Sequence, residues 1–321
     1  MQKRYPLLGM SIGRLTPPPT QQHGALALYK GNTPIDVEIR SSLLDKAWLE
    51  AVSSECLNWK DTRPGAAMCK IIALQREKEY VLYFAMTHAM FDGCSAQIIT
   101  DEFLKLLADP NAILPTIDEN TEGMSFKDIM DAEIIQPANG FMDHVRSVMG
   151  ARPVDGQLTG NYTKIEVQNR AGSLLVEFSA HETQLCVTKA KNMGVTFNAL
   201  ACAAWARTVA SDQRYNVRAE GSQFLAFVVD ARAALPLKYA NTLAQIMGPG
   251  FATVDLTKSL ADQCIHIAAT VKMVIGNNWH FIPTNRGVND GDNPTRLATA
   301  PIGELSTSFA RVNATMSNLG L

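Results

Sequence analysis

The sequence predicts an α/β protein built from two subdomains, and three observations lead to this prediction. The chain has 321 residues, more than a single hydrophobic core usually supports. Its first half alternates strand-like with helix-like segments, and the alternation resumes after an irregular middle section. The hydrophobic fraction of 46% and the charged fraction of 19% are typical of a globular protein.

Up to Met86, the first half contains four predicted strands and a helix. Leu7 to Ile12 is predicted as a strand, and Ile35 to Ile39 alternates apolar with polar residues as a half-buried strand does. Leu43 to Val52 is predicted to be helical. Cys69 to Leu74 and Tyr80 to Met86 are rich in β-branched and aromatic residues, so we expect them to be neighbouring strands.

An amphipathic helix is predicted after Gly93. Ser95 is the candidate N-cap, and Asp109 followed by Pro110 ends the helix. The residues expected on its apolar face are Ala96, Ile99, Phe103, Leu106 and Leu107.

The second half begins after a crossover placed at about residues 145–170, which gives subdomains 1–155 and 156–321. Helices are expected at Glu182 to Met193, ended by Gly194, at Phe197 to Ala210, capped by Thr196, and at Ser259 to Ile275. The expected strands are Leu174 to Phe178, Phe224 to Val229 and Val312 to Met316.

The charge balance and the cysteines limit the possible functions. Twenty-nine basic and thirty-one acidic side chains give a net charge of −2, so no surface for nucleic acid is expected. The six cysteines lack C-x-x-C or zinc-ligand spacing, which favours reduced thiols in a cytoplasmic protein without a metal. We find neither a signal peptide nor an apolar run of transmembrane length.

Among the six histidines, His88 is distinguished by its position. A predicted strand leads into it and the amphipathic helix begins just after it, and such loops are where sheets present reactive groups. A neutral imidazole can take a proton from a hydroxyl or amine that attacks a carbonyl, provided that the other ring nitrogen is held in place. The alternative interpretation is a buried structural histidine followed by a plain turn.

The residues after His88 extend the candidate site. Asp92 either orients His88 directly or pairs with a distant arginine and fixes the loop, and the residues alone leave both possibilities open. Gly93 removes a side chain where the chain turns sharply and a substrate passes close by. Cys94 offers a different chemistry, a Cys–His pair that forms an acyl-enzyme, although a thiol at the start of a helix is more often a packing residue.

Three segments resemble the CoA-dependent acyltransferase superfamily, which includes chloramphenicol acetyltransferase, the plant BAHD acyltransferases, fungal alcohol and trichothecene acetyltransferases, and the condensation domains of peptide synthetases. Tyr83 to Gly93 resembles the H-x-x-x-D-G signature. Val229 to Pro236, followed by Tyr239 to Asn241, resembles the D-x-R-x-x-L-P…Y-x-N stretch of BAHD-like and fungal members. Met316 to Gly320 resembles the S-N-x-G strand of alcohol acetyltransferases.

The resemblance implies a role for each matching residue. His88 matches the base that deprotonates the acceptor, and Asp92 matches a structural aspartate that points away from the substrate. Arg232 matches the arginine that pairs with this aspartate, and Gly93 matches the glycine that leaves room in the solvent channel. Ser317 and Asn318 match a strand that lines the channel, where one of them could bind the oxyanion; Asp230 and Asn241 are expected to be structural.

Some features depart from the family pattern. Thr87 stands where peptide-forming condensation domains usually carry a second histidine, which argues against that activity. The D-F-G-W-G element of the plant enzymes is absent. Arg4 to Leu8 resembles the end of the family's first helix, and the family continues beyond the position of Gly320, so we expect elements to be missing at both ends.

The resemblance implies two chloramphenicol-acetyltransferase-like subdomains, each a mixed sheet flanked by helices, with an active-site channel between them. The expected activity is transfer of an acyl group, acetyl above all, from acyl-CoA as co-substrate to an alcohol or amine of a secondary metabolite. No bound cofactor or metal is expected, and the protein is expected to be a monomer. The alternatives are a non-catalytic, binding-only relative and a condensation domain that uses carrier-bound acyl groups.

Overall fold

The structure is a computed structural model that describes residues 1–14, 26–29, 33–41, 45–58, 67–76, 79–88, 90–121, 124, 126–150, 173, 175–211, 221–281 and 314–316. Contacts divide the chain into two units. Unit 1 contains the described parts of Met1–Ile129, Glu166–Glu177 and Ala234–Ile246, and unit 2 contains the rest. The number of units agrees with the two predicted subdomains, but each unit draws on several stretches of chain, whereas we had placed one division at residues 155 and 156.

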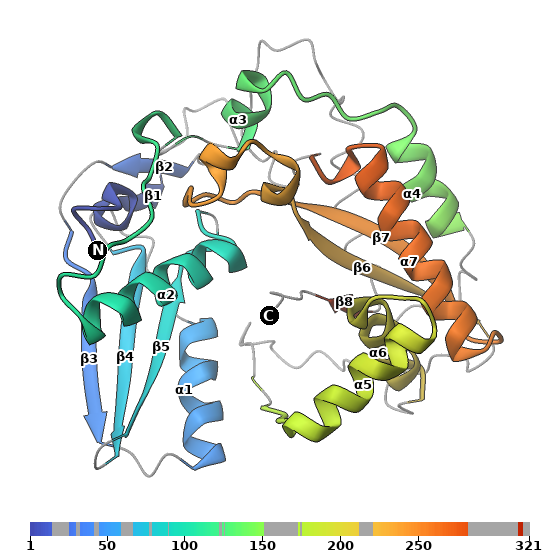
Figure 1. Cartoon of the computed structure of the whole chain (residues 1–321), viewed down its shortest axis with the longest axis horizontal. Coiled ribbons are helices and arrows are strands. Elements are labelled where there is room, and N and C mark those ends of the chain that lie inside the picture. The colour runs from blue at the N-terminus through green and yellow to red at the C-terminus, as the bar shows by residue number, and fades with distance from the viewer. Residues whose placement is uncertain are drawn as a thin grey trace. The chain divides into compact units, whose positions relative to one another are not determined.

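Unit 1 is built on a three-stranded sheet with the order β3-β4-β5 (Figure 1). Strands β4 (Cys69–Arg76) and β5 (Glu79–Met86) are antiparallel neighbours, as predicted. Strand β3 (Asp36–Ser41) pairs with β4 in parallel, which requires a crossover, and α1 (Lys46–Asn58) lies within that crossover. The sheet is therefore mixed, as expected.

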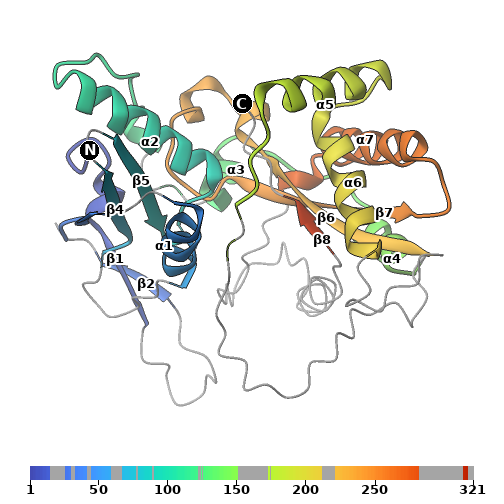
Figure 2. The ribbon, with the colours of Figure 1, turned by 90° about the horizontal axis from the view of Figure 1, so that it is seen from below.

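Two helices cover the two faces of this sheet. Successive side chains of a strand point to opposite faces, so Ile71 and Ile72 of β4 face different helices. Ile72 packs with Val52 of α1, and Ile71 packs in a cluster with Ile99 of α2 (Gly93–Ala108). Figure 2 shows α1 and α2 on opposite sides of β4 and β5.

The predicted strand at Leu7 to Ile12 is wrong in its first half. Pro6–Gly9 forms a 3₁₀ helix, η1, and only Ser11–Arg14 forms a strand, β1, which pairs antiparallel with β2 (Leu26–Tyr29). Pro6 presets the helical backbone at the start of η1. Leu7 and Leu8 are both buried, which two successive residues of a half-buried strand cannot be.

Unit 2 is built on a second mixed sheet, with the order β7-β6-β8. Strand β6 (Ser222–Asp230) is antiparallel to β7 (Met247–Asp255) and parallel to β8 (Ala314–Met316). The prediction found β6 and β8 but not β7. Leu174 to Phe178 was also predicted as a strand, and its described residues form none.

Strand β7 was missed because Gly248, Pro249 and Gly250 resemble a turn. The glycines are needed for close packing. A Cβ at Gly248 would lie 1.7 Å from the carbonyl oxygen of His280, and one at Gly250 would lie 2.0 Å from the ring of Phe227. Pro249 is tolerated because β7 is at the edge of the described sheet, where a strand can lack an N–H donor.

The three long helices of unit 2 begin and end close to where the sequence predicts. Helix α5 (Ala180–Asn192) starts with a capping box and is followed by Gly194, whose φ of 68° is the left-handed conformation that glycine allows. Thr196 caps α6 (Phe197–Ser211), because its side chain accepts the Ala199 amide at 3.3 Å. Ser259 caps α7 (Leu260–Gly276).

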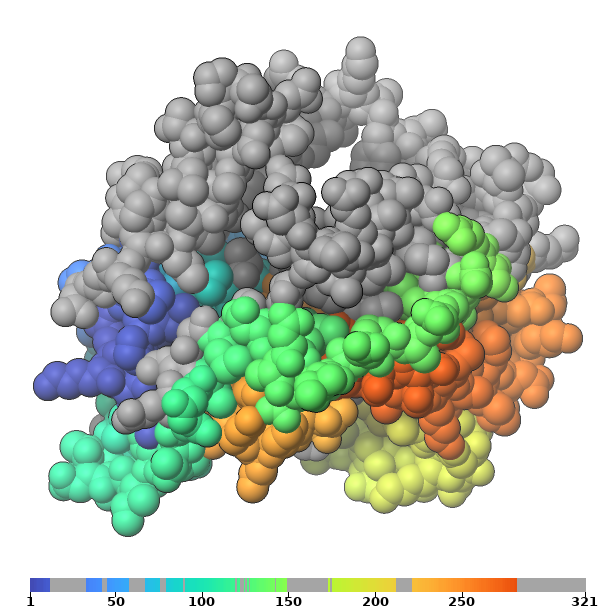
Figure 3. Space-filling model, turned by 90° about the horizontal axis from the view of Figure 1, so that it is seen from above, coloured from blue at the N-terminus to red at the C-terminus, as the bar shows by residue number. Residues whose placement is uncertain are grey.

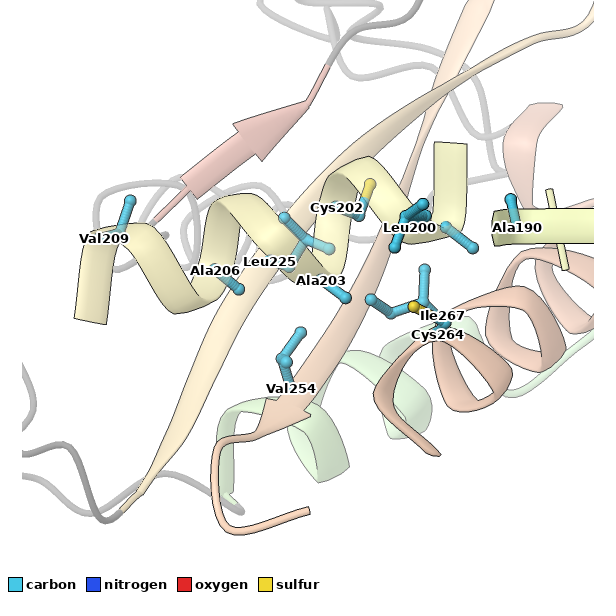
Figure 4. Packing of buried hydrophobic residues seen from close by; sticks show 11 residues of the cluster. Ala190, Leu200, Cys202, Ala203, Ala206, Val209, Leu225, Val254, Cys264 and Ile267 are labelled. Carbon is cyan, nitrogen blue, oxygen red and sulfur yellow. The ribbon is translucent and has the colours of Figure 1, made fainter. Parts of the chain in front are cut away.

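The sheet of unit 2 is packed on both faces. Figure 4 shows Leu225 of β6 and Val254 of β7 in one cluster with residues of α6 and α7. Ala203 and Ala206 belong to this cluster, and their small side chains let α6 pack closely against the other members of the cluster. Further members of the cluster are Ala190, Ala199, Leu200, Cys202, Val209, Cys264 and Ile267.

The other face is covered by α4 (Phe141–Gly150) and the 3₁₀ helix η6 (Trp279–Phe281), neither of which was predicted. In the space-filling view, α4 (green) adjoins the orange to red part of the chain that contains α7 (Figure 3). The imidazole of His144 donates to the Phe251 carbonyl of edge strand β7 at 3.0 Å and stacks on the Trp279 ring.

The remaining elements are short. They are the helix α3 (Phe126–Ala132) and the 3₁₀ helices η2 (Glu119–Thr121), η4 (Arg232–Ala234) and η5 (Leu237–Tyr239). Within the described ranges no helix has the length and apolar character to cross a lipid bilayer.

Candidate active site

The turn that carries His88 is fixed by backbone hydrogen bonds. The Thr87 amide donates to the Met68 carbonyl at 2.9 Å, which extends the pairing of β4 and β5 by one step. The Thr87 carbonyl then accepts the amides of Met90 at 3.0 Å and Phe91 at 3.2 Å, and these bonds close the turn. His88 therefore lies at the end of β5, as predicted, and its side chain is exposed.

The His88 ring is oriented by a backbone carbonyl. Its Nδ1 atom lies 3.0 Å from the carbonyl oxygen of Phe91. A carbonyl oxygen only accepts hydrogen bonds, so Nδ1 must carry the hydrogen. In the neutral imidazole, Nε2 then keeps its lone pair. The geometry gives His88 the tautomer that a general base needs, and it excludes the interpretation of His88 as a buried histidine.

Asp92 is the N-cap of α2, in place of Ser95, which we had predicted. Its Oδ1 accepts the Ser95 amide at 2.8 Å, and its Oδ2 accepts the Ile246 amide, 154 positions along the chain, also at 2.8 Å. The residue is 4% exposed. Asp92 thus fixes the start of the helix that follows the His88 turn, whereas the hydrogen bond that orients the His88 ring comes from Phe91.

Gly93 and Cys94 are the first two residues of α2. Gly93 has a helical backbone, so the sharp turn that we expected to require glycine is not there. The other expected reason for glycine, room for a substrate, stays a prediction, and so does the Cys–His alternative. The Cys94 thiol is half-buried.

The C-terminal half of α2 is held by a second contact. Glu102 is 2% exposed, and its carboxylate accepts from Nε of Arg4 at 2.6 Å and from Nη2 at 2.8 Å. Such a two-point pairing is rigid because both groups are planar. Helix α2 is therefore held at its N-cap, Asp92, and again at Glu102.

Arg232 and Asp230, at the end of β6, contact each other. An Arg232 Nη1 atom lies 3.1 Å from Asp230 Oδ1, which also accepts the Arg232 amide. Arg232 is buried, at 8% exposed. Asp92 belongs to unit 1 and Arg232 to unit 2, and the ion pair expected between them stays a prediction.

The structure describes only some of the other predicted site residues. Ser317 and Asn318 lie outside the described residues. Asn241 is half-buried and follows Tyr239, which is buried. Among the residues that the structure describes, we find no group of three or more histidine, cysteine, aspartate or glutamate side chains that could hold a metal.

Sequence reasoning missed two backbone groups of the site, one that contacts His88 and one that contacts Asp92. The Phe91 carbonyl holds the ring, and the Ile246 amide holds Asp92. The residue type does not indicate whether its backbone carbonyl or amide contacts a site residue. Only the spacing of His88 and Asp92 around a turn hints that the carbonyl between them faces the ring.

Comparisons with known proteins identify the fold through similar solved structures. No family model and no curated protein sequence matches the chain. Solved structures do match. The first condensation domain of the calcium-dependent antibiotic synthetase has a TM-score of 0.60 at 12% identity, over 86% of this chain and 63% of that one. The EpoB cyclization-docking bidomain from Sorangium cellulosum has a TM-score of 0.57 at 15% identity, over 86% and 55%.

A third match is polyketide synthase associated protein 5 from Mycobacterium tuberculosis, with a TM-score of 0.57 at 15% identity, over 87% of this chain and 65% of that one. The chain thus spans less than two thirds of the length of each of these three proteins. The chain has the two-subdomain α/β fold of the condensation domains of peptide and polyketide synthetases.

Proposed function

We propose that the chain transfers an acyl group from a thioester to an alcohol or amine, with His88 as the general base. The observation that carries this proposal is the hydrogen bond from His88 Nδ1 to the Phe91 carbonyl. It leaves Nε2 unprotonated on an exposed ring at the tip of a strand. The H-x-x-x-D-G resemblance and the condensation-domain fold support the same chemistry.

The proposed reaction is a direct transfer. Nε2 of His88 takes the proton of the acceptor hydroxyl or amine while the acceptor attacks the thioester carbonyl. The tetrahedral oxyanion then collapses, the carbon–sulfur bond breaks, and the leaving thiolate takes the proton from the imidazolium. Acceptor and thioester become ester or amide plus free thiol. The Phe91 carbonyl accepts the Nδ1 hydrogen throughout, so the ring keeps its orientation during both proton transfers.

The thioester donor is the open choice within this proposal. We propose acyl-CoA, with an acetyl group first, because the matches to Val229–Pro236 and Met316–Gly320 are with CoA-using branches and because Thr87 replaces a second histidine. A donor bound to a carrier protein is the second candidate, favoured by the condensation domains among the similar structures. The partner is then a carrier protein in place of CoA.

A donor comparison tests both candidates. Acyl-CoA and an acylated carrier protein are each offered with a panel of alcohols and amines, and thiol release and product mass are followed. Acceptor-dependent release from acyl-CoA supports the first candidate, and release only from the carrier supports the second. No acceptor-dependent release from either donor contradicts the proposed function and favours a binding-only relative.

The variant His88→Asn tests the base. The asparagine amide can still donate to the Phe91 carbonyl but cannot take a proton, so the turn is preserved while the base is lost. We expect turnover to fall by about 10²–10⁴-fold with unchanged thermal stability. His181→Asn, at an exposed histidine of α5, is the matched control and should leave turnover unchanged. Near-normal turnover in His88→Asn would reject His88 as the base.

A further inference from the structure

The chain segment 242–246 is bound to the first turn of α2 by side chains of that turn. Ser95 Oγ donates to the Ala244 carbonyl at 2.9 Å and lies 3.3 Å from the Ala244 amide, which donates back to it. Two residues further on, the Ile246 amide donates to Asp92 at 2.8 Å. Ser95 therefore takes both backbone groups of one residue, much as a neighbouring strand would.

This contact is buried. Ser95 is 0% exposed and Ala244 is 5% exposed. Leu243, the residue before Ala244, packs in the same apolar cluster as Phe91 and Ile99. Losing a buried hydrogen bond is costly, because the backbone group left without its partner cannot form a hydrogen bond to water instead.

Segment 242–246 lies just before β7 and contacts the residue that follows Phe91. Ile246 directly precedes Met247, the first residue of β7. The contact between segment 242–246 and α2 therefore fixes the chain where it leaves unit 1. On the other side of the contact, Asp92 directly follows Phe91, whose carbonyl holds the His88 ring. The hydrogen bond from the Ile246 amide and the hydrogen bond to the His88 ring therefore involve two adjacent residues, Asp92 and Phe91.

Building on the acyl transfer proposed above, we propose that Ser95 is a positioning residue for His88. It fastens Ala244, and this keeps the Ile246 amide on Asp92. With Asp92 fixed, the neighbouring Phe91 carbonyl stays against Nδ1 and holds His88 in the tautomer with Nε2 free. Ser95 itself takes no part in the proton transfers.

The consequence is specific to the tautomer. If Ser95 is replaced by alanine, the segment 242–246 loosens, the start of α2 gains freedom, and the Phe91 carbonyl no longer selects one ring nitrogen. His88 should then sample both neutral tautomers, and the fraction with Nε2 free should fall. A purely structural role for Ser95 would lower stability without changing the tautomer.

The experiment combines a spectrum with a rate. The full chain is labelled with ¹⁵N-histidine, and the His88 signals, assigned by their loss in His88→Asn, report which ring nitrogen carries the hydrogen. The parent should show the Nδ1–H form, and Ser95→Ala should show a mixture. We expect the acyl-transfer kcat to fall by about 5–10-fold, as the loss of one hydrogen bond implies. Ser95→Thr, which keeps the hydroxyl, should restore both readings.

Thr270→Val is the matched control, because it removes a buried hydroxyl that donates to the His266 carbonyl within α7 of unit 2. It should leave the His88 spectrum and the kcat unchanged. If Ser95→Ala fails to fold, Ser95→Cys, with a similar volume and a weaker donor, takes its place. An unchanged Nδ1–H signal in a folded Ser95→Ala variant overturns the proposal.

The two readings separate this inference from the proposed function. If the parent transfers no acyl group but the His88 tautomer still shifts in Ser95→Ala, acyl transfer is wrong while the hold of Ser95 on the His88 turn stands. If the parent is active and neither tautomer nor kcat changes in the variant, acyl transfer stands and the positioning role is wrong.

Discussion

Replacing Asp92 by alanine should destabilise the protein by about 3 kcal/mol. The side chain accepts two backbone amides, Ser95 at one oxygen and Ile246 at the other. A hydrogen bond to a charged group contributes about 1.5–3 kcal/mol, so the two together contribute about 3–6 kcal/mol. Removing the carboxylate also removes the cost of burying its charge, which favours the lower end of that range.

Asparagine at the same position separates the two bonds. Asp92→Asn keeps an oxygen for the Ser95 amide, and asparagine caps helices about as well as aspartate. Its NH₂ group, however, faces the Ile246 amide, which is also a donor, so that bond is lost. We expect a loss of about 1.5 kcal/mol, half of the alanine effect. Asp143→Ala, at an exposed carboxylate in the first turn of α4, is the control and should change stability little.

The assay is urea unfolding followed by circular dichroism, with hydrogen exchange of the amides of α2 as a local measure. The parent should be most stable, followed by Asp92→Asn and then Asp92→Ala, and the amides in the first turn of α2 should exchange faster in the same order. A total stability of about 5–15 kcal/mol, usual for proteins, makes a loss of this size easy to measure. An alanine variant that unfolds like the parent would refute the capping and anchoring roles of Asp92.

Two further predictions concern stability alone. Ile134→Gly should stabilise the protein by about 0.5–1 kcal/mol, because this exposed residue ends α3 with a φ of 53°, a conformation that disfavours a β-branched side chain; thermal unfolding would measure the gain, and a lower Tm would contradict it. Burial lowers the pKa of His280 and also that of His144. Their neutral forms are favoured in the folded state, so stability is full above their unfolded pKa of about 6.5 and is lost as the pH falls through the lower folded values. The Tm should therefore drop as the pH falls below about 6.5, and His144→Gln should make that drop smaller; an equal drop in the variant would exclude His144 as a contributor.

The parts of the fold that were predicted are those with local signals. Helices α5, α6 and α7 begin at Ser179, Thr196 and Ser259, whose side chains bind the first free amides. Such caps are encoded within four residues and need no knowledge of the rest of the chain. Ser95 shows the limit of this reasoning, since it has the right residue type for a cap but lies three residues too late, where its hydroxyl instead binds Ala244.

Strand β7 was missed because its sequence is set by distant neighbours. Gly248 and Gly250 lie where the backbone of η6 and the ring of Phe227 leave no space for a side chain. Taken alone, glycine on both sides of a proline indicates a turn. The same residues in an edge strand permit close contact, and only the packing of unit 2 distinguishes the two cases.

The candidate site follows the same division. The sequence places His88 correctly between a strand and a helix, because β5 and α2 have clear patterns, but it puts the N-cap of that helix at Ser95 instead of Asp92. It leaves open whether Asp92 orients His88 or pairs with a distant arginine, and it gives no sign of the Ile246 amide, 154 positions away, that donates to Asp92 in the structure. That amide could have belonged to any residue type except proline, so no motif could have revealed it.

The low identity of the similar structures gives this point a wider consequence. At 12–15% identity, this chain shares a fold with the first condensation domain of the calcium-dependent antibiotic synthetase and with the EpoB cyclization-docking bidomain, while most side chains differ. The groups that orient His88 and Asp92 here are the Phe91 carbonyl and the Ile246 amide, which survive almost any substitution. A ring held by a backbone carbonyl stays in place as long as the turn and the segment 242–246 keep their paths. The fold can therefore keep the orientation of the His88 ring while the surrounding side chains change.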